Sequence, residues 1–485
     1  MPGFKSARSR GMRRGPLVVL VAGMMAVGVV SPAAAGVQYE AGSAGLGDPY
    51  FPNSGNGGYD VQRYYLKTDY DPATRVLTGT TTITATATQN LSRFNLDLYK
   101  MNVRSVRVDG RDASFERTGE RELEITPSAG LPKTRVFTVV VRYDGVPQPL
   151  TGPFVFNDLY GFLPTKDGAT VMGEPDGAAT WFPSNDHPTD KALFTIETTV
   201  PSGLKAISNG SLVGQWSAGG KDTFLWREDR PMATYLVSNS IGHFNVSTTT
   251  TSKGISQLDA VDQDVASDPD ALNTPRLTTR VTDELGDRFG PYPFGTTGSI
   301  VHHNNVPPLN LESALETQGR PTYQSPPVER GVAHEISHQW FGDSVSVRQW
   351  KDTWLNEGFA KWVEWYWAEQ HGGPSAQDSS QQWYDNPPPT LPYQPAFWDV
   401  VVADPTRDEI FHRAIYFRGG MALQALRHKI GDDSFFQLVR TWVAEHKYGN
   451  ASTEDFETLA QQVSGQDLTR FFNVWLHTPG KPTSW

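Results

Sequence analysis

Residues 334–341 of this 485-residue chain read HEISHQWF, and they restrict the local fold more than any other stretch. Two histidines, His334 and His338, lie four residues apart, with Glu335 directly after the first. On an α-helix, side chains at positions i and i+4 project from the same face about one turn apart. The segment therefore fits a helix that presents two imidazoles to one point, with a carboxylate beside them.

The flanking residues predict where this helix begins and ends. Ser325 can cap its amino end, Pro326 suits the first turn, and Gly342 can terminate it. The expected buried stripe recurs every four residues: Val328, Val332, Ile336 and Trp340.

The HExxH spacing allows two imidazoles to hold one zinc ion, with Glu335 placed to take a proton from a bound water. The alternative is a surface helix with two solvated histidines. The HExxH pattern fixes three positions, and it occurs by chance in about one chain in a hundred of this length, so the motif alone does not decide between the two. Catalytic zinc also needs a third protein ligand. Glu357, in WLNEGFAKWVEW, follows His338 with 18 residues between them. A helix beginning near Trp354 would bring its carboxylate back towards the histidines.

The composition excludes several other kinds of site. The chain has 42 basic and 53 acidic residues and a formal net charge of −11, so it repels nucleic acid and anionic membranes and favours cationic groups such as free amino termini. It contains no cysteine, and therefore no disulfide, thiolate ligand or cysteine nucleophile. We expect no nucleic-acid partner and no stable membrane association.

The first 35 residues have the layout of a secretory signal peptide. Basic residues precede an apolar run from Pro16 to Val30, and small residues then allow cleavage near Ala35–Gly36. Fifteen apolar residues are short for a membrane span. We expect a soluble protein that is secreted to the extracellular side. Arg13-Arg14 leaves the Sec and twin-arginine export routes both open.

Two domains are predicted after the signal peptide, giving a multidomain α+β fold. Residues 36–246 contain β-branched or alternating runs typical of an all-β domain of the saddle or sandwich kind. Helical patterns dominate residues 247–485. The clearest β runs are Leu77–Thr88, Phe94–Tyr99, Val103–Gly110, Val136–Tyr143 and Leu193–Val200, and the clearest helical ones are Ala271–Gly290, Gly358–Gly373 and Met421–Gly431.

HEISHQWFGDSV followed by WLNEGFA resembles the aminopeptidase N family of gluzincin zinc metallopeptidases, whereas thermolysin-type endopeptidases use a longer gap before the glutamate. The resemblance covers nearly all of the chain from GDPYFPNSGNGGYDV onward. It implies a thermolysin-like, mainly helical catalytic domain with one zinc ion per chain. The implied ligands are His334, His338 and Glu357, with Glu335 as general base. The chain resembles a short bacterial-type member without the C-terminal helical domain of larger relatives, so we expect a more open cleft.

An aminopeptidase must recognise a free α-ammonium group, which requires carboxylates near the metal. The segment SALET stands where the family has Gly-x-Met-Glu-Asn, and the resemblance implies that Glu316 grips the amino terminus and that Ala314 contacts the substrate. The segment MGEPDGAATWFPSNDHPTDKA resembles the family's Gln-x-Glu stretch and implies Glu174 as a second ammonium-binding acid. A solvated loop acid is the alternative for Glu174.

Two further side chains are candidates. AIYFRGGMALQALR resembles the family's Tyr-Glu-Lys-Gly-Ala element and implies that Tyr416 donates a hydrogen bond to the oxyanion. Glu364 lies seven residues after Glu357, nearly on the same helix face. It could orient a metal ligand or an ammonium group, or it could be an ordinary surface acid.

The sequence thus predicts a secreted zinc aminopeptidase whose partners are peptides with a free amino terminus. A zinc endopeptidase would share the metal chemistry but needs no ammonium-binding acids. An epoxide hydrolase, as in one branch of the family, is a further alternative. The alternative outside enzymes is a non-catalytic peptide-binding protein on the same fold, which would typically have lost a ligand, Glu335 or Tyr416.

Overall fold

The computed structural model describes residues 15–16, 38–152, 159–303, 313–391 and 394–483. The chain divides into two compact units, Met1–Gln38 and Tyr39–Trp485, and all features below belong to the second. The predicted signal peptide, residues 1–35, lies outside the described residues except for 15–16 and stays a prediction.

The amino-terminal part of the second unit is built from three sheets, which agrees with the predicted all-β architecture. The eight-stranded sheet has the order β15 (Ser211–Ala218), β16 (Lys221–Met232), β13 (Ala192–Pro201), β2 (Tyr59–Asp71), β3 (Val76–Ala87), β9 (Val136–Gly145), β5 (Asn102–Val108) and β6 (Arg111–Asp112). The four-stranded sheet has the order β1 (Glu40–Ala41), β4 (Leu91–Asp97), β8 (Glu122–Thr126) and β7 (Ser114–Thr118). The five-stranded sheet has the order β10 (Leu150–Thr151), β11 (Leu159–Pro164), β12 (Ala169–Met172), β17 (Asn239–Gly242) and β14 (Lys205–Ser208).

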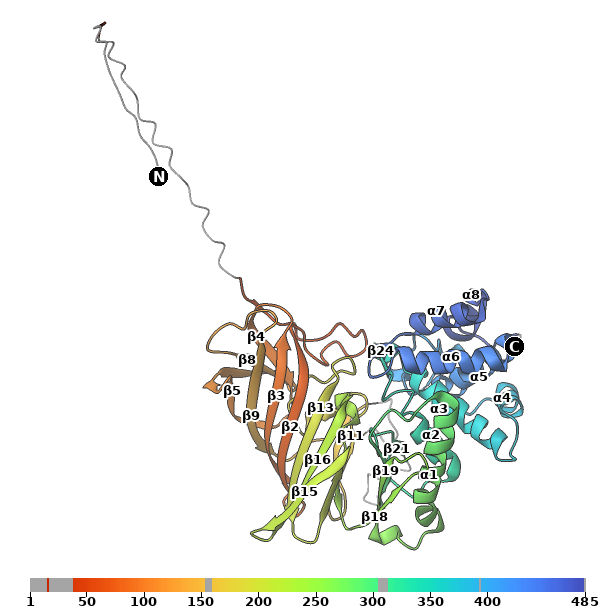
Figure 1. Ribbon diagram of the computed structural model, residues 1–485, viewed down its shortest axis with the longest axis horizontal. Coiled ribbons are helices and arrows are strands. Elements are labelled where there is room, and N and C mark those ends of the chain that lie inside the picture. The colour runs from red at the N-terminus through yellow and green to blue at the C-terminus, as the bar shows by residue number, and fades with distance from the viewer. Residues whose placement is uncertain (1–14, 17–37, 153–158, 304–312, 392–393, 484–485) are drawn as a thin grey trace, which may run out of the picture. The chain divides into compact units, whose positions relative to one another are not determined.

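Strand β3 shows why this part of the sequence forms sheet. Its residues VLTGTTTITATA alternate between buried and more exposed positions, and Leu77, Ile83 and Ala85 point into the core. β3 pairs antiparallel with both β2 and β9, and β2 pairs in parallel with β13, so these strands lie side by side (Figure 1). The period-2 pattern therefore predicted this strand correctly.

A further five-stranded sheet, with mixed parallel and antiparallel pairing, opens the carboxyl-terminal part. Its order is β18 (Phe244–Thr250), β19 (Ser256–Asp262), β20 (Thr296–Val301), β22 (Thr322–Tyr323) and β21 (Ala314–Leu315). The β pattern predicted for the stretch ATYLVSNSIGHFNVSTTTT includes β18. The sequence pattern did not reveal β20, β21 and β22, because β21 and β22 are two residues long and β20 is buried along its whole length without alternation. The domain boundary predicted at residue 246 lies within β18 and remains a prediction.

Helices make up most of the remaining chain, as predicted. They are α1 (Pro269–Phe289), α2 (Glu329–Ser337), α3 (Trp354–Gln370), α4 (Ala376–Asp385), α5 (Arg413–Ile430), α6 (Asp432–Glu445), α7 (Thr453–Ser464) and α8 (Thr469–Phe472). A two-stranded ladder joins β23 (Ser346–Val347) to β24 (Asn450–Ala451). Short 3₁₀ segments include η2 (Gly177–Thr180) and η3 (Thr234–Leu236).

Helix α3 lies at the centre of the helical part. It packs against α2, α4 and α5, and α1 packs against α2 and β20 (Figure 1). Its aromatic side chains fill the core, where Trp362 stacks on Tyr366 with ring centroids 5.2 Å apart.

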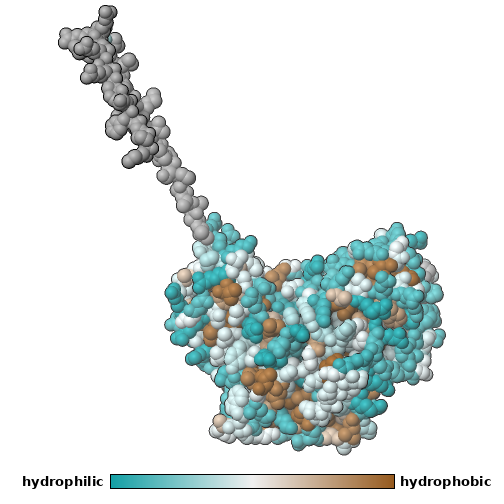
Figure 2. All heavy atoms as spheres, viewed as in Figure 1, coloured by the Kyte–Doolittle hydropathy of each residue, from teal (hydrophilic) through white to brown (hydrophobic). Residues whose placement is uncertain are grey.

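None of the helices in the described part of the chain combines the length and the apolar character that a membrane span requires. The face in Figure 2 is mainly hydrophilic, with scattered apolar patches.

Candidate active site

Helix α2 carries the HEISH residues, but it is shorter than predicted. It begins at Glu329 and ends at Ser337, with Val328 as the amino-terminal cap and His338 as the carboxyl-terminal cap. The predicted start at Ser325 is wrong, because Pro327 disfavours a helical conformation at the residue before it, and Val328 itself is extended. Val328 is consequently 50 % exposed, and it is not part of the buried stripe. The other three stripe residues, Val332, Ile336 and Trp340, are fully buried as predicted.

The two histidines and Glu357 meet where α2 packs against the first turn of α3. The Glu357 Oε2 atom lies 3.2 Å from His334 Nε2 and 3.5 Å from His338 Nε2. One donor atom from each of the three residues lies within 4.8 Å of the others. The predicted start of the second helix, α3, at Trp354 is correct, and this start places Glu357 in the first turn of α3.

The other nitrogen of each imidazole is already engaged by the protein. His334 Nδ1 lies 2.7 Å from Glu364 Oε1, which also accepts a hydrogen bond from Lys361 Nζ at 2.6 Å. His338 Nδ1 donates to the Phe341 carbonyl at 3.0 Å. Both rings therefore turn their Nε2 atoms towards Glu357. Of the two roles considered for Glu364, its position supports the one in which it orients a ligand.

The charges around the three residues favour a cation. Burial lowers the pKa of His334, but hydrogen bonds to Glu357 and Glu364 raise it more, to about 9. For His338, burial is outweighed by Glu316 and Glu357, and its pKa is raised to about 10. Burial opposes ionisation of Glu357, yet His338 and His334 hold its pKa well below the usual value. Two imidazole nitrogens and one carboxylate oxygen at this spacing form a donor set that fits zinc.

Glu335 lies on the same helix, beside the three donors. It is 8 % exposed, and burial raises its pKa to about 7, against the opposing influence of His334 and His338. One carboxylate oxygen of Glu335, one of Glu316 and one nitrogen of His338 lie within 4.8 Å of one another. A carboxyl group whose pKa is near neutrality can both accept and return a proton.

Glu316 and Glu174 come from different sheets and converge near this cluster. Glu316 follows β21 and Glu174 follows β12, and the adjacent side chains Leu315 and Met172 pack together in a small apolar cluster with Leu163. Burial raises the pKa of both glutamates. Among the charged neighbours of Glu174, the Glu316 carboxylate raises the pKa of Glu174 most. The Oε1 atom of each glutamate is buried without a hydrogen-bond partner among the described residues.

Ala314 occupies the β21 position that pairs with Tyr323 on β22, and it is half-buried. Its strand therefore holds the backbone that leads into Glu316. Ala314 thus lies two residues before Glu316 in the sequence. Its contact with a substrate stays a prediction.

Tyr416 approaches the cluster from α5. Its ring lies 6.3 Å from the His334 ring at an angle of 19°, and its hydroxyl hydrogen-bonds to the Glu357 side chain. Burial and the carboxylates of Glu357 and Glu174 raise the pKa of Tyr416 well above its usual value, so it remains a protonated donor at neutral pH. Six predicted side chains thus gather around one point: His334, His338, Glu357, Glu335, Glu316 and Tyr416, with Glu174 at the side of Glu316.

Two basic residues, the half-buried Lys191 and the buried Arg418, support the site and were not assigned a role from the sequence. Lys191 Nζ donates to the carbonyl oxygens of Asp343 and Ser344, at 2.9 and 3.1 Å, and so ties the β part to the turn after α2. Arg418, two residues after Tyr416, is fully buried, and its acceptors among the described residues are backbone carbonyls. Both side chains act through backbone carbonyls of segments distant in sequence, so no local pattern indicates these roles.

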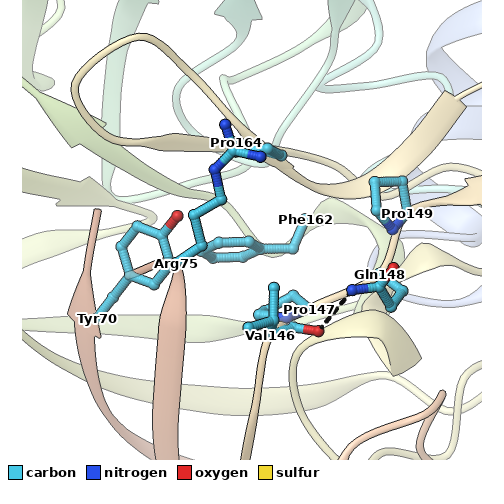
Figure 3. Close-up of a pocket in the computed structure, with 8 residues that line it drawn as sticks. All are labelled: Tyr70, Arg75, Val146, Pro147, Gln148, Pro149, Phe162 and Pro164. Atoms are coloured by element: carbon cyan, nitrogen blue, oxygen red, sulfur yellow. Dashed lines mark hydrogen bonds between the residues drawn. The ribbon is translucent and has the colours of Figure 1, made fainter. Parts of the chain in front are cut away.

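A separate cavity of about 120 Å³ lies in the β part (Figure 3). Tyr70, Phe162 and Arg75 line it together with three prolines, Pro147, Pro149 and Pro164. Its lining contains no carboxylate and no imidazole, so it offers none of the chemistry of the cluster on α2 and α3.

Two family models match this chain. The Peptidase M1 N-terminal domain matches residues 60–236, and the Peptidase family M1 domain matches residues 314–475. Among curated proteins, aminopeptidase N of Lactococcus lactis is 26 % identical over 451 residues, which cover 87 % of this chain and 51 % of that protein. A probable aminopeptidase 1 of Saccharolobus solfataricus is 26 % identical over 420 residues, which cover 80 % of this chain and 50 % of that protein. The chain spans about half the length of these curated relatives.

Solved structures match over a longer share of their chains. The M1 zinc metallopeptidase from Deinococcus radiodurans superimposes with a TM-score of 0.80 at 29 % identity, covering 91 % of this chain and 99 % of that one. A variant of that enzyme, crystallised with a Tyr-Ser-Ala substrate, superimposes with a TM-score of 0.78. The two M1 models together match more than half of the chain, the two-domain architecture is shared, and the donor set fits the metal: the chain belongs to the M1 family of zinc metallopeptidases.

Proposed function

We propose that this protein is an aminopeptidase that removes the first residue from peptides with a free amino terminus. One observation carries the proposal. Glu316 and Glu174, from two different sheets, converge beside the metal cluster, and each has a buried carboxylate oxygen without a hydrogen-bond partner among the described residues. Buried carboxylates of this kind are costly unless a positive group pairs with them. An α-ammonium group held there would place the first peptide bond next to His334, His338 and Glu357.

A zinc ion held by His334, His338 and Glu357 would polarise the scissile carbonyl and lower the pKa of a water molecule beside it. Glu335 then accepts a proton from that water and passes it to the leaving amine, a role supported by its buried position beside the three donor residues. The hydroxyl of Tyr416 donates a hydrogen bond to the carbonyl oxygen as negative charge develops there. Glu364 and the Phe341 carbonyl keep the two imidazoles in orientation.

The relatives support the same activity. The two curated relatives described above are named aminopeptidases, and a variant of the Deinococcus radiodurans neighbour was crystallised with a tripeptide substrate. For this chain the preferred substrates follow from the site chemistry: peptides whose amino terminus is free and protonated.

The test compares one peptide in two forms, with a free and with an acetylated amino terminus, each with and without a chelator. We expect release of the first residue from the free form alone, abolished by the chelator and restored by added zinc. Internal cleavage of the acetylated peptide would replace the proposal with a zinc endopeptidase. No cleavage of either form would leave a non-catalytic peptide-binding protein.

Secretion is part of the proposal and rests on the signal-peptide layout of residues 1–35. Expression of the full chain in a bacterial host should release a protein whose amino-terminal sequence starts at Gly36. Retention of the intact amino terminus inside the cell would contradict secretion without affecting the proposed activity.

A further inference from the structure

Tyr235 is a buried side chain that the proposed mechanism leaves without a role. It lies in the 3₁₀ segment η3 of the β part and is 1 % exposed. Its ring packs edge-on against Trp350, with ring centroids 5.4 Å apart at 66°. Thr234 donates to Asp186 Oδ1 at 2.7 Å, and Asn209 Nδ2 donates to the Leu236 carbonyl at 3.0 Å. Bonds on both sides of Tyr235 therefore fix its position.

The backbone of Tyr235 lies directly against the segment that carries Glu174. A Cβ atom added to Gly173 would collide with the Tyr235 carbonyl oxygen and would stand 3.2 Å from its Cα. Only glycine fits here, and the next residue is Glu174. The two segments are thus held in contact, so Tyr235 and Glu174 keep a fixed relation to each other.

Tyr235 has an unusual electrostatic environment. It is buried and has no hydrogen-bond partner within the described part of the chain. Burial raises the pKa of Tyr235 well above its usual value, and the carboxylates of Glu316 and Glu174 are the next largest causes. The same two glutamates each carry a buried, unpartnered Oε1 atom. Three buried polar atoms without a partner among the described residues therefore share one electrostatic neighbourhood, where a bound polar group could pair with them.

The chemistry of the expected ligand matches this set. An α-ammonium group has three N–H donors, whereas Glu316 and Glu174 supply two acceptor groups. A tyrosine hydroxyl can accept one hydrogen bond and donate another at the same time. We propose that Tyr235 is a substrate-binding residue whose hydroxyl oxygen accepts the third N–H of the α-ammonium group. The inference rests on the proposed aminopeptidase function and adds a third member to its ammonium-binding group.

The alternative is that Tyr235 only packs against Trp350. A Tyr235→Phe variant separates the two roles, because it keeps the ring and removes the hydroxyl. A hydroxyl with no partner within the protein contributes little to the stability of the free enzyme. The variant should therefore keep the melting temperature of the wild type and lose affinity only for ligands that carry the amine.

The experiment measures inhibition of the zinc-loaded enzyme by two matched compounds, phenylalanine hydroxamate and 3-phenylpropanohydroxamate, which differ only in the α-amine. We expect the wild type to favour the amine-bearing compound, and Tyr235→Phe to weaken it about tenfold to a hundredfold, as for loss of a hydrogen bond to a charged group. Inhibition by the compound without the amine should not change. KM for an aminoacyl arylamide should rise in parallel with the weaker inhibition.

Tyr59→Phe is the matched control. Tyr59 is equally buried in the β part, but its hydroxyl donates to the Asn95 carbonyl at 2.7 Å. This control should melt at a lower temperature and keep the preference for the amine. If Tyr235→Phe retains the wild-type preference, or weakens both compounds equally while lowering the melting temperature, the role of Tyr235 is wrong. If the wild type itself shows no preference for the amine, the proposed aminopeptidase function is wrong.

Discussion

Gly358 and Gly419 lie against each other where α3 crosses α5. A Cβ atom added to Gly358 would stand 3.0 Å from the backbone carbon atoms of Gly419, closer than side chains normally approach. Gly358 directly follows Glu357, and Gly419 lies three residues after Tyr416. The close crossing of the two helices therefore brings the hydroxyl of Tyr416 to the carboxylate of Glu357.

Gly358→Ala should separate these helices. We expect a loss of about 1–3 kcal/mol of stability from overpacking, together with a lower kcat because Tyr416 shifts. Thermal unfolding and steady-state kinetics measure the two effects. Gly286→Ala is the control, since Gly286 lies in α1 with no atom closer than 3.9 Å to an added Cβ. It should be neutral or stabilise by about 0.5–1 kcal/mol, and equal behaviour of the two variants would contradict the account.

Arg418 should be one of the most sensitive positions for stability. Its guanidinium donates to backbone carbonyls of two separate segments. The acceptors are Trp398 and Val400 in one segment and Val474, Trp475 and Thr478 in the other. Arg418→Lys cannot reproduce the planar fork of donors and leaves several carbonyls unpaired, so we expect a loss of about 3 kcal/mol or more in urea unfolding. The exposed Arg104→Lys, whose side chain pairs with Asp144, should leave the free energy of unfolding nearly unchanged. A mild effect at Arg418 would mean that water replaces the lost donors.

Glu364 should matter for metal affinity more than for chemistry. Because it holds the Nδ1 atom of His334 at 2.7 Å, Glu364→Gln should weaken zinc binding about tenfold to a hundredfold. Competition with a chromogenic chelator measures the affinity. With zinc in excess, most of the turnover should return. Unchanged zinc affinity would show that Glu364 does not support the zinc site through His334.

Glu228 provides a pH test away from the metal cluster. It is 3 % exposed, and burial raises its pKa to about 7, above the value of 4.5 expected in the unfolded chain. The unfolded chain thus ionises first as pH rises, and stability is lost between about pH 4.5 and 7. Glu228→Gln should reduce this loss by at most roughly 3 kcal/mol. The free energy of unfolding of both proteins at pH 5 and pH 7.5 gives the comparison. Identical pH dependence would show that Glu228 is not buried in its neutral form.

The parts of the site that depend on local spacing were predictable from the sequence. The i and i+4 histidines and the helix start at Trp354 follow from patterns within a few residues. The start of α2 did not, because Pro327 overrides the capping preference of Ser325. The short strands β21 and β22 carry no periodicity that a sequence pattern can reveal.

The contacts between distant segments were predictable only through the family resemblance. Nothing in the residues around Glu174 indicates that it meets Glu316, since the approach depends on Met172 and Leu315 packing across two sheets. Tyr235 was not predicted at all. A buried hydroxyl without a partner is a property of the folded surroundings, and no local pattern marks it.

The most direct measurement of the central claim compares zinc content and turnover in three proteins: wild type, Glu335→Gln and Glu357→Gln. We predict about one zinc ion per chain in the wild type and in Glu335→Gln, and none in Glu357→Gln, which loses a ligand. Release of the first residue should fall by about three orders of magnitude or more in Glu335→Gln, because the proton acceptor is gone. Near-normal turnover in Glu335→Gln, or full zinc content in Glu357→Gln, would contradict the account.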